Sequence, residues 1–251
     1  MEKLSNLVKF LDRELKTKKI KDISVNGLQV KAKNREVKTI GFATDACLST
    51  FEKAKKEKVD LLIVHHGVKW KPQKYISIQG RRIDWLKKYH ISLYTAHAPL
   101  DLNERDGHNI GLAQILNLKK IKKFGKLEGV TYGFSGRLKK PMKIEQIAKR
   151  LNKTLKTKSK IFNFNKKEIK TLGIVAGSSG GCIEEAARKK LDCFLLGEVR
   201  LEQVREAQDL KLNLIVAGHY ATETIGLKLL EKKIKSKFEV NTIFIDDPVQ
   251  I

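Results

Sequence analysis

Short apolar runs alternate with stretches of helical hydrophobic spacing along most of the chain. Leucines and a valine recur every three or four positions over 3–15, which predicts an amphipathic helix. An apolar run at 39–43 is followed by Thr44, Asp45 and further small residues, which offer caps for a helix, then by helical spacing over about 48–57 and by a longer apolar run at 59–67. The last three segments together predict a β-α-β unit.

The run at 59–67, VDLLIVHHG, is the clearest strand signal in the chain. A continuous aliphatic run bounded by Asp and Gly is typical of a strand buried on both faces of a parallel sheet. His65 and His66 therefore stand at its C-terminal edge, where open α/β sheets bind ligands. Successive strand residues point to opposite faces, so two neighbouring metals fit this spacing better than one ion. The alternative is a polar strand end that only hydrogen-bonds a loop.

The remaining pattern predicts further short elements on both sides of the lysine-rich stretch 119–126, where the pattern of apolar positions changes. Before that stretch, it predicts a turn at Asn26–Gly27 beside a short strand, a loop over 68–80, a helix over 82–89, a strand over 91–97 and a short helix over 109–116. After it, it predicts a strand over 131–138, a helix following Pro141 and a strand over 161–165. We therefore expect a first α/β domain over 1–124 and a second over 125–251, whose C-terminal part could pack back onto the first.

An internal repeat relates the two expected domains. Residues 39–67 align without a gap with 171–199, with six identities that include Gly41 with Gly173 and Asp60 with Asp192. We infer a duplication, in which LYTAH corresponds to LIVAGH and the strand ends of both halves lie on comparable edges. The predicted fold class is α/β, with two linked, similar domains, mostly parallel central strands and a dinuclear metal site in the cleft between them.

Candidate metal ligands follow three of the predicted strands. His97 and Asp101 follow the strand at 91–97, and His219 and Glu223 are spaced i,i+4, so a helix beginning near His219 would present both side chains on one face. The candidate ligand set is His65, His66, Asp101, His219 and Glu223. Imidazole and carboxylate donors without thiolates suit Zn, Mn, Fe or Co, and two such ions can share a bridging carboxylate. The alternatives are that Asp101 caps the next turn and that Glu223 lies on a solvated helix face.

Size and composition restrict the class of protein. The chain has 251 residues, is 41% hydrophobic and contains no apolar run long enough to cross a bilayer. Its N-terminal segment lacks the apolar core of a signal peptide, so we expect a cytoplasmic protein. The three cysteines, Cys47, Cys182 and Cys193, show no close pairing motif, which argues against disulfides and thiolate zinc and favours buried apolar roles.

The net charge of +24, from 52 Lys+Arg against 28 Asp+Glu, has two interpretations. It could serve sequence-independent contact with DNA or RNA phosphates, because lysine greatly outnumbers arginine, the usual reader of bases. It could instead be the lysine-rich surface of a protein from a hot or AT-rich organism. The excess is spread over 16–21, 119–126 and 149–170, so we slightly favour the surface interpretation.

Seven segments carry a resemblance to a known family. In chain order they are NGLQV, VDLLIVHHG, AHAPLD, GRLKKPM, GSSGG, LGEVRL and GHYATE. Together they resemble the family named for Ngg-one-interacting factor three, many members of which are labelled GTP cyclohydrolase I type 2 homologues. The resemblance covers nearly the whole chain and implies two linked α/β domains, a dinuclear metal site in a cleft and a hexamer with a central cavity.

The resemblance also implies roles for individual residues. His65 and Asp101 would bind one divalent ion, His66 and His219 the other, and Glu223 would bridge them. His97 would support a ligand or carry a proton. The chain departs from the family pattern after HHG, where VKW replaces a proline and bulky apolar residues.

The expected function is that of a metal-dependent, cyclohydrolase-like hydrolase acting on a small nucleotide-like or phosphorylated substrate. No P-loop is present in the sequence, and GSSGG is better interpreted as a tight strand-to-helix turn than as an anion site. The alternative is a hexameric scaffold that binds nucleic acid without sequence preference and holds a structural metal.

Overall fold

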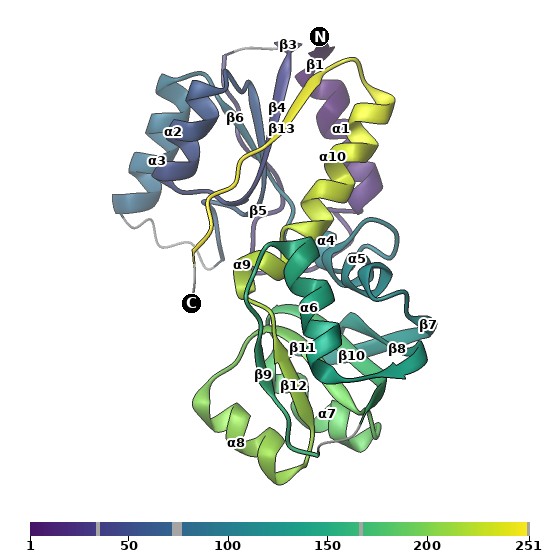
Figure 1. Ribbon diagram of the computed structural model, residues 1–251. Helices are drawn as coiled ribbons and strands as arrows, with labels where there is room; N and C mark the ends of the chain where they lie inside the picture. The colour runs from purple at the N-terminus through teal and green to yellow at the C-terminus, as the bar shows by residue number, and fades with distance from the viewer. Residues whose placement is uncertain (34–35, 72–76, 166–167, 250–251) are drawn as a thin grey trace. The chain divides into compact units, whose positions relative to one another are not determined.

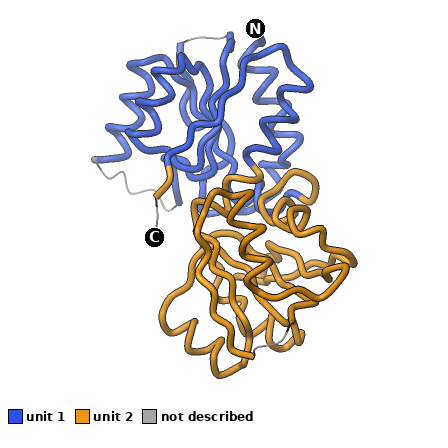
Figure 2. The backbone as a smooth tube through the Cα atoms, in the orientation of Figure 1, with its two compact units in different colours: residues 1–103, 227–247 blue, residues 104–226, 248–251 orange. Residues whose placement is uncertain are grey.

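The computed structural model describes the chain except residues 34–35, 72–76, 166–167 and 250–251 (Figure 1). The chain forms two compact units (Figure 2). Unit 1 contains Met1–Asn103 and Leu227–Asp247, and unit 2 contains Glu104–Gly226 with the residues from Pro248 on. The change between units thus falls earlier than the division at 124/125 predicted from the sequence, and the chain returns to unit 1 near its end.

Unit 1 is built on a five-stranded sheet of order β13-β4-β5-β6-β2. The strands are β13 (Asn241–Phe244), β4 (Thr39–Asp45), β5 (Leu61–His66), β6 (Ser92–Thr95) and β2 (Gly27–Val30). The first four are parallel neighbours, and β2 is antiparallel to β6. A separate antiparallel pair joins β1 (Glu2–Lys3) to β3 (Glu36–Val37). The C-terminal segment belongs to unit 1 because β13 pairs with β4.

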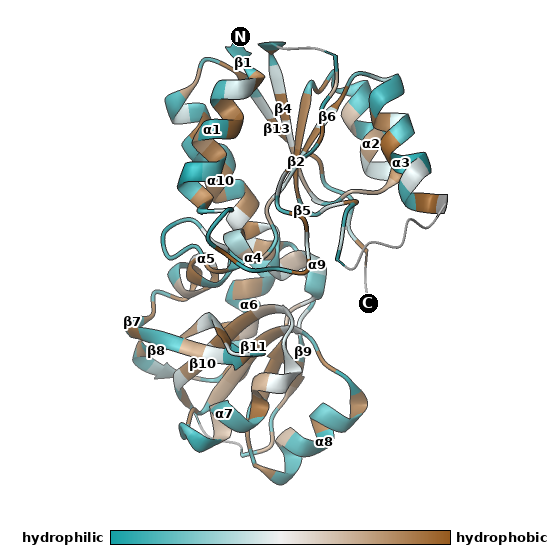
Figure 3. Cartoon of the chain, turned by 180° about the vertical axis from the view of Figure 1, so that it is seen from behind, coloured by the Kyte–Doolittle hydropathy of each residue, from teal (hydrophilic) through white to brown (hydrophobic). Residues whose placement is uncertain are grey.

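Two layers of helices cover this sheet. Helices α1 (Leu4–Leu15) and α10 (Ile225–Lys237) lie on one face, and α2 (Leu48–Lys56) and α3 (Ser77–Lys88) lie on the other (Figure 1). Along β5, Leu61 and Ile63 pack with the α1 and α10 side chains, whereas Leu62 and Val64 pack with those of α2 and α3. Alternation along a doubly covered strand explains why it is apolar throughout, and the central strands are accordingly largely hydrophobic in Figure 3.

Unit 2 has a six-stranded mixed sheet of order β7-β8-β10-β11-β12-β9. Its strands are β7 (Lys119–Leu127), β8 (Val130–Met142), β10 (Ile169–Ser178), β11 (Cys193–Glu198), β12 (Asn213–Val216) and β9 (Lys160–Phe162). Among these neighbours, only the pairs β10-β11 and β11-β12 are parallel, and the other pairs are antiparallel. The expected mostly parallel strands therefore form the centre of each sheet, while antiparallel strands complete both.

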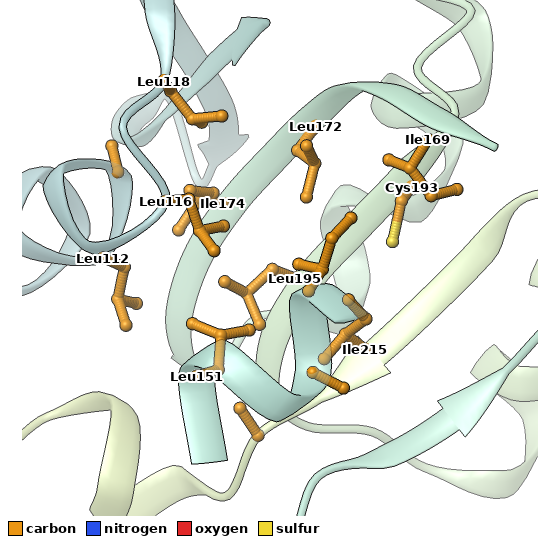
Figure 4. Packing of buried hydrophobic residues seen from close by; sticks show 14 of the residues in the cluster. Leu112, Leu116, Leu118, Leu151, Ile169, Leu172, Ile174, Cys193, Leu195 and Ile215 are labelled. Carbon is orange, nitrogen blue, oxygen red and sulfur yellow. The ribbon is translucent and has the colours of Figure 1, made fainter. Parts of the chain in front are cut away.

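The helices of unit 2 again form two layers. Helices α5 (His108–Ile115) and α6 (Ile144–Leu155) contribute to one apolar cluster, shown in Figure 4, and α7 (Ile183–Arg188) and α8 (Leu201–Asp209) to another. Cys193 and Leu195 of β11 pack in the first cluster, and Phe194 and Leu196 pack in the second. Short helical turns complete the chain: α4 (Ala98–Asp101), α9 (His219–Thr222) and the 3-10 turn η1 (Gly180–Cys182).

Most predicted elements are confirmed, and the differences have local causes. The loop predicted over 68–80 is wrong at its end, because α3 begins at Ser77, whereas 72–76 lie outside the described residues. The lysine-rich stretch is strand β7, an edge strand with exposed lysines, which discourage pairing with another chain. Strand β8 continues through Pro141, next to a register shift in its pairing with β10, where a missing amide is tolerated.

The two segments aligned in the sequence each have an aspartate that accepts the same two backbone hydrogen bonds at equivalent positions. Asp60 Oδ2 accepts from the amides of Lys38 at 2.8 Å and Thr39 at 2.9 Å. Asp192 Oδ2 accepts from the amides of Lys170 at 3.0 Å and Thr171 at 2.7 Å, which are the equivalent residues 132 positions further along. The segments thus have the same local architecture, as the alignment predicts.

Two expectations about composition can also be compared with the structure. Cys182 and Cys193 are buried as expected, whereas Cys47 is partly exposed, and all three are free thiols. Among the described residues, no helix combines the length and the apolar character that a bilayer span requires.

Candidate metal-binding site

The candidate ligands of unit 1 lie where two parallel neighbours, β5 and β6, end. Strand β5 ends in His65 and His66, and β6 leads through His97 into α4, which ends at Asp101. Gly67 permits the close turn after β5, because a Cβ atom there would lie 2.3 Å from Thr95 Oγ1. The sheet edge thus brings together side chains that are distant in sequence.

His65 is completely buried and held by one ring nitrogen. Its Nδ1 lies 3.0 Å from the carbonyl oxygen of Ala96, which can only accept, so Nδ1 carries the proton and Nε2 carries the lone pair. Nε2 lies 3.8 Å from Asp101 Oδ2. This separation is too long for a hydrogen bond, but it suits two ligands of one ion, each about 2.0–2.2 Å from the metal.

His66 and His97 are oriented by carboxylates in the same way. His66 Nδ1 lies 2.8 Å from Asp45 Oδ1, and His97 Nδ1 lies 3.0 Å from Asp22 Oδ1. Both contacts assign the proton to Nδ1 and leave Nε2 as the donor atom for a metal. Histidines that bind metals are usually fixed through their other nitrogen in this manner.

Asp22 organises the loop behind His97. Its carboxylate also accepts from the amides of Ser24 at 3.1 Å and Ala98 at 2.9 Å, and from Asn26 Nδ2 at 2.7 Å. Burial alone would raise the pKa of Asp22, but the hydrogen bond and charge of His97, with the other donors, lower it to about 2. The carboxylate is therefore ionised at any ordinary pH and holds His97 in place.

The three histidines form a cluster that could bind a metal ion. The ring centroids lie 4.6 Å apart for His65 and His66 and 4.9 Å apart for His65 and His97. Each ring offers one ligand nitrogen, and the three nitrogens lie within 4.8 Å of one another. The rings of the adjacent residues His65 and His66 thus lie close together at the C-terminal end of β5.

Unit 2 carries its own group of imidazole and carboxylate side chains. His219 Nε2 lies 3.1 Å from Glu223 Oε2, which confirms that the i,i+4 spacing puts both on one side of α9. His219 Nδ1 lies 3.1 Å from Glu198 Oε2 at the end of β11. Burial would lower the pKa of His219, but Glu223 and then Glu198 outweigh it and raise the pKa to about 9.

Gly177 makes room for the buried carboxylate of Glu223. It has a φ of +66°, and a Cβ atom built on it would lie 2.3 Å from Glu223 Oε1 and 3.3 Å from His219 Nε2. Its amide donates to Thr222 Oγ1 at 3.1 Å. The conformation and the space both require glycine at this position.

The structure thus gathers His65, His66, His97 and Asp101 in unit 1 and His219 with Glu223 in unit 2. Sequence reasoning overlooked the groups that orient them. It assigned Asp45 to capping α2, which is wrong, because the N-cap is Cys47 without a side-chain cap, and Asp45 contacts His66. Asp45 and Glu198 could have been found, since each ends a parallel strand like His66. Asp22 gave no such signal, because it does not end a strand.

These observations define a class: a two-unit α/β protein whose strand ends carry histidine and carboxylate clusters that could bind metal ions. Comparison with known proteins gives the family. The chain belongs to the Duf34/NIF3 (NGG1p interacting factor 3) family, whose profile matches residues 2–248. A protein of Pyrococcus abyssi called GTP cyclohydrolase 1 type 2 homolog is 41% identical over 244 residues, covering 96% of this chain and 97% of that protein.

Solved structures share the fold over the full chain. Protein TTHA1606 from Thermus thermophilus is 34% identical, with a TM-score of 0.87 and complete coverage of both chains. Protein ybgI, described as of unknown function, is 27% identical, with a TM-score of 0.89 and the same coverage. The family resemblance noted from the sequence motifs is therefore confirmed.

Proposed function

We propose that the protein is a metal-dependent hydrolase with a dinuclear divalent-metal centre, acting on a small nucleotide-like or phosphorylated substrate. The ligands are His65, His66, Asp101, His219 and Glu223. His65 and Asp101 bind one ion, His66 and His219 bind the other, and Glu223 bridges them. Bound divalent ions of this kind lower the pKa of a coordinated water and so supply hydroxide near neutral pH.

One observation carries this proposal: each histidine of the unit 1 cluster is fixed through Nδ1 and presents Nε2. The Nδ1 acceptors are Ala96 O for His65, Asp45 for His66 and Asp22 for His97. A purely structural polar strand end does not need three rings in one tautomer with a ligand nitrogen from each within 4.8 Å of the others. The donor set contains imidazole and carboxylate but no thiolate, which fits Zn, Mn, Fe or Co.

His97 has a separate role in the proposal. Because the Asp22 carboxylate holds its Nδ1 proton, Nε2 is the atom that accepts a proton from the substrate side or returns it. Asp22 fixes the orientation of the ring. His97 is therefore assigned as a proton carrier, although its position in the cluster also allows it to bind a metal.

A cavity beside Asp22 supports an anionic substrate. It has a volume of about 520 Å³ and lies in unit 1. Lys18, Lys21 and Lys71 line it together with Asp22 and Ser24, so positive charge surrounds a space next to the Asp22–His97 pair. A phosphorylated or nucleotide-like molecule matches this charge. The Pyrococcus relative is called a GTP cyclohydrolase homolog, a name that points to the same class of substrate.

The deciding experiment measures metal content in the full chain purified without chelator. We expect about two divalent ions per chain. Glu223→Gln, which removes the charge of the proposed bridge, should lose both ions, whereas Asp101→Asn should mainly lose one. Glu202→Gln is the matched control, because Glu202 is an exposed carboxylate on α8. Incubation with GTP and other nucleotides, followed by chromatography of the products, then tests hydrolysis.

The outcomes separate the parts of the proposal. Full retention of metal in both ligand variants would overturn the dinuclear centre. Loss of one ion in each would show that Glu223 is a terminal ligand. Normal metal content without turnover of any nucleotide or phosphorylated compound would leave a structural metal, as in the alternative scaffold function. Light scattering of the same samples tests the hexamer that the family resemblance implies.

A further inference from the structure

A second cavity lies in unit 2. The described residues that line it include none of the candidate metal ligands and no histidine or carboxylate. It has a volume of about 540 Å³ and is formed where the end of α5, the strands β7 and β8, and helix α6 come together. Its lining residues are Leu116, Asn117, Lys119, Leu138, Lys139, Lys140, Met142 and Arg150. We call it the basic pocket.

Four cations converge on the basic pocket without a compensating carboxylate. Lys119, Lys139, Lys140 and Arg150 are all exposed, and none of the described residues that line the pocket is acidic. Nor does any of the four form an ion pair with a carboxylate in the described part of the chain. Elsewhere on unit 2, exposed cations do have such partners, as Lys189 has Glu185 and Lys123 has Glu104. Like charges gathered in this way repel one another, and a bound anion would relieve the repulsion.

The arginine of the pocket is held in position by the protein. When the Asn117 amide is oriented so that both its atoms are satisfied, its oxygen accepts from Arg150 Nη2 at 2.8 Å. Its nitrogen then donates to Gln114 O at 3.2 Å. A guanidinium fixed along one edge keeps its remaining N–H groups available for two oxygens of one phosphate.

The remaining lining suits the uncharged part of a nucleotide. Leu116, Leu138 and Met142 supply an apolar floor between the cations. The described lining residues include no aromatic ring on which a base could stack, so base identity should matter little. The positive charge continues along the edge strand β7 through Lys120 and Lys122, both exposed, which extends it beyond a single phosphate.

From these features we infer that the basic pocket binds the phosphate groups of nucleotide units without base preference, in a nucleic acid strand or in a free nucleotide. The pocket gathers Lys119 from the lysine-rich stretch 119–126, Lys139 and Lys140 from β8, and Arg150 from α6 in one concave site. This site uses none of the proposed metal ligands, and the inference therefore stands independently of the proposed hydrolase activity.

The test compares two triple variants of the full chain that lose equal charge. The site variant is Lys139→Gln, Lys140→Gln, Arg150→Gln, and the control is Arg188→Gln, Lys189→Gln, Arg205→Gln on α7 and α8. All six side chains are exposed, so both proteins should fold, which circular dichroism and unchanged metal content verify. The probes are a fluorescein-labelled thymidine 20-mer, followed by anisotropy, and ATP, followed by calorimetry.

For the 20-mer at low salt, the site variant should bind at least about tenfold more weakly than the wild-type chain, and the control about threefold or less. The slope of log K against log salt should become shallower by about 2 in the site variant, because each lost phosphate contact on a single strand contributes about 0.7. Loss of ATP binding as well would identify a free nucleotide as a source of the phosphate, and loss for the 20-mer alone would identify a polymer.

Three results would overturn the inference. The first is no binding of either probe by the wild-type chain at low salt. The second is equal weakening in the site and control variants, which would show that the net charge of +24 acts diffusely. The third is binding by the site variant with unchanged affinity and salt slope.

Discussion

The β-α-β segments 39–66 of unit 1 and 171–198 of unit 2 have the same strand pairing but carry different side chains at the C-terminal ends of their strands. In both, the first strand pairs in parallel with the second in the same register, with Ile40 opposite Leu61 and Leu172 opposite Cys193. At the C-terminal edge, His65 of unit 1 corresponds to Gly197. The comparison shows that one scaffold can carry different chemistry when only the residues after the buried core change.

The difference at this edge concerns space as much as chemistry. Asp45 of unit 1 corresponds to Gly177, and its carboxylate contacts His66. In unit 2 the carboxylate near the same backbone position comes from Glu223, after the next strand. A Cβ atom on Gly197 would lie only 2.7 Å from the backbone of Gly177. Unit 2 thus has glycines, Gly177 and Gly197, at the two positions where unit 1 has Asp45 and His65. The carboxylate of Glu223 occupies the space next to Gly177.

The largest expected effect breaks this arrangement at Gly177. In Gly177→Ala, the new methyl group meets Glu223 Oε1 and the φ of +66° becomes strained. We expect a loss of about 3–5 kcal/mol in the free energy of unfolding, measured by urea denaturation of metal-free protein, from strain and displacement of a buried carboxylate. Metal bound through Glu223 should also be lost.

Gly129→Ala is the matched control for this change. Gly129 has a φ of +84°, but a Cβ atom there meets nothing within 4 Å. It should cost only about 1–2 kcal/mol, which is the strain of the left-handed conformation by itself. Equal losses in the two variants would mean that Glu223 does not depend on the space above Gly177.

The matching carboxylates Asp60 and Asp192 give the next largest effect. Each accepts two backbone amides at the start of the first strand, and Asp192 also accepts from Thr171 Oγ1 at 2.7 Å. Hydrogen bonds to a charged group are worth about 1.5–3 kcal/mol each in favourable cases, less near solvent. We expect Asp60→Ala to cost about 2 kcal/mol and Asp192→Ala somewhat more, by urea denaturation. A negligible cost in only one of them would contradict the structural equivalence of the segments.

The sequence predicted the scaffold well because burial on both faces leaves a simple signal. Strand β5 could be recognised from LLIV, and its counterpart β11 from the alignment. The sequence allowed the C-terminal part to pack back onto the first domain, but it did not identify β13 as the returning strand, because NTIF is short and its partner β4 lies about 200 positions earlier. Local periodicity gives no information about such long-range pairing.

The candidate site was predictable to the extent that its residues lie at the end of a strand or just after it. His66 and His219 satisfy that rule, and so does Asp45, which was nevertheless interpreted as a helix cap. Asp22 lies in an irregular segment, and its role depends on tertiary contact with His97, 75 positions later. Contacts of this kind cannot be derived from the spacing of residues in one segment.

The two units should also respond to opposite ends of the pH range in chelator-treated protein. The pKa of Asp22 in unit 1 is depressed from 3.8 to about 2, so its stabilising contribution is present above pH 3.8 and is lost as pH falls through 2. The pKa of His219 in unit 2 is raised from 6.5 to about 9, so its contribution is complete below pH 6.5 and is lost as pH rises through 9. At about 1.4 kcal/mol per pKa unit, each should amount to about 2–3 kcal/mol.

Urea denaturation as a function of pH checks both contributions. Asp22→Asn should flatten the stability profile between pH 4 and 2 and leave the alkaline side unchanged, because an amide there cannot ionise. His219→Gln should flatten the profile between pH 6.5 and 9 and leave the acid side unchanged. A profile that either variant alters at both ends would show that the two groups are coupled, contrary to their separate hydrogen-bond partners.

The smallest expected effect uses a feature that the two segments share. Lys58 and Lys190 each lie two residues after the last residue of α2 and α7, in the left-handed conformation, with φ of 54° and 52°. In both, the next amide bonds five residues back, from Val59 N to Ala54 O at 3.0 Å and from Leu191 N to Ala186 O at 3.1 Å. This is the Schellman pattern of helix termination, in which asparagine tolerates the positive φ better than lysine. Lys58→Asn and Lys190→Asn should each therefore raise the free energy of unfolding by about 0.5 kcal/mol, and the double variant should show the sum, because the two sites belong to different units. Lys189→Asn, one residue earlier with a negative φ of −79°, is the control and should give no gain. Stabilisation at only one of the two sites would show that the helix ends, unlike the strands, are not energetically equivalent.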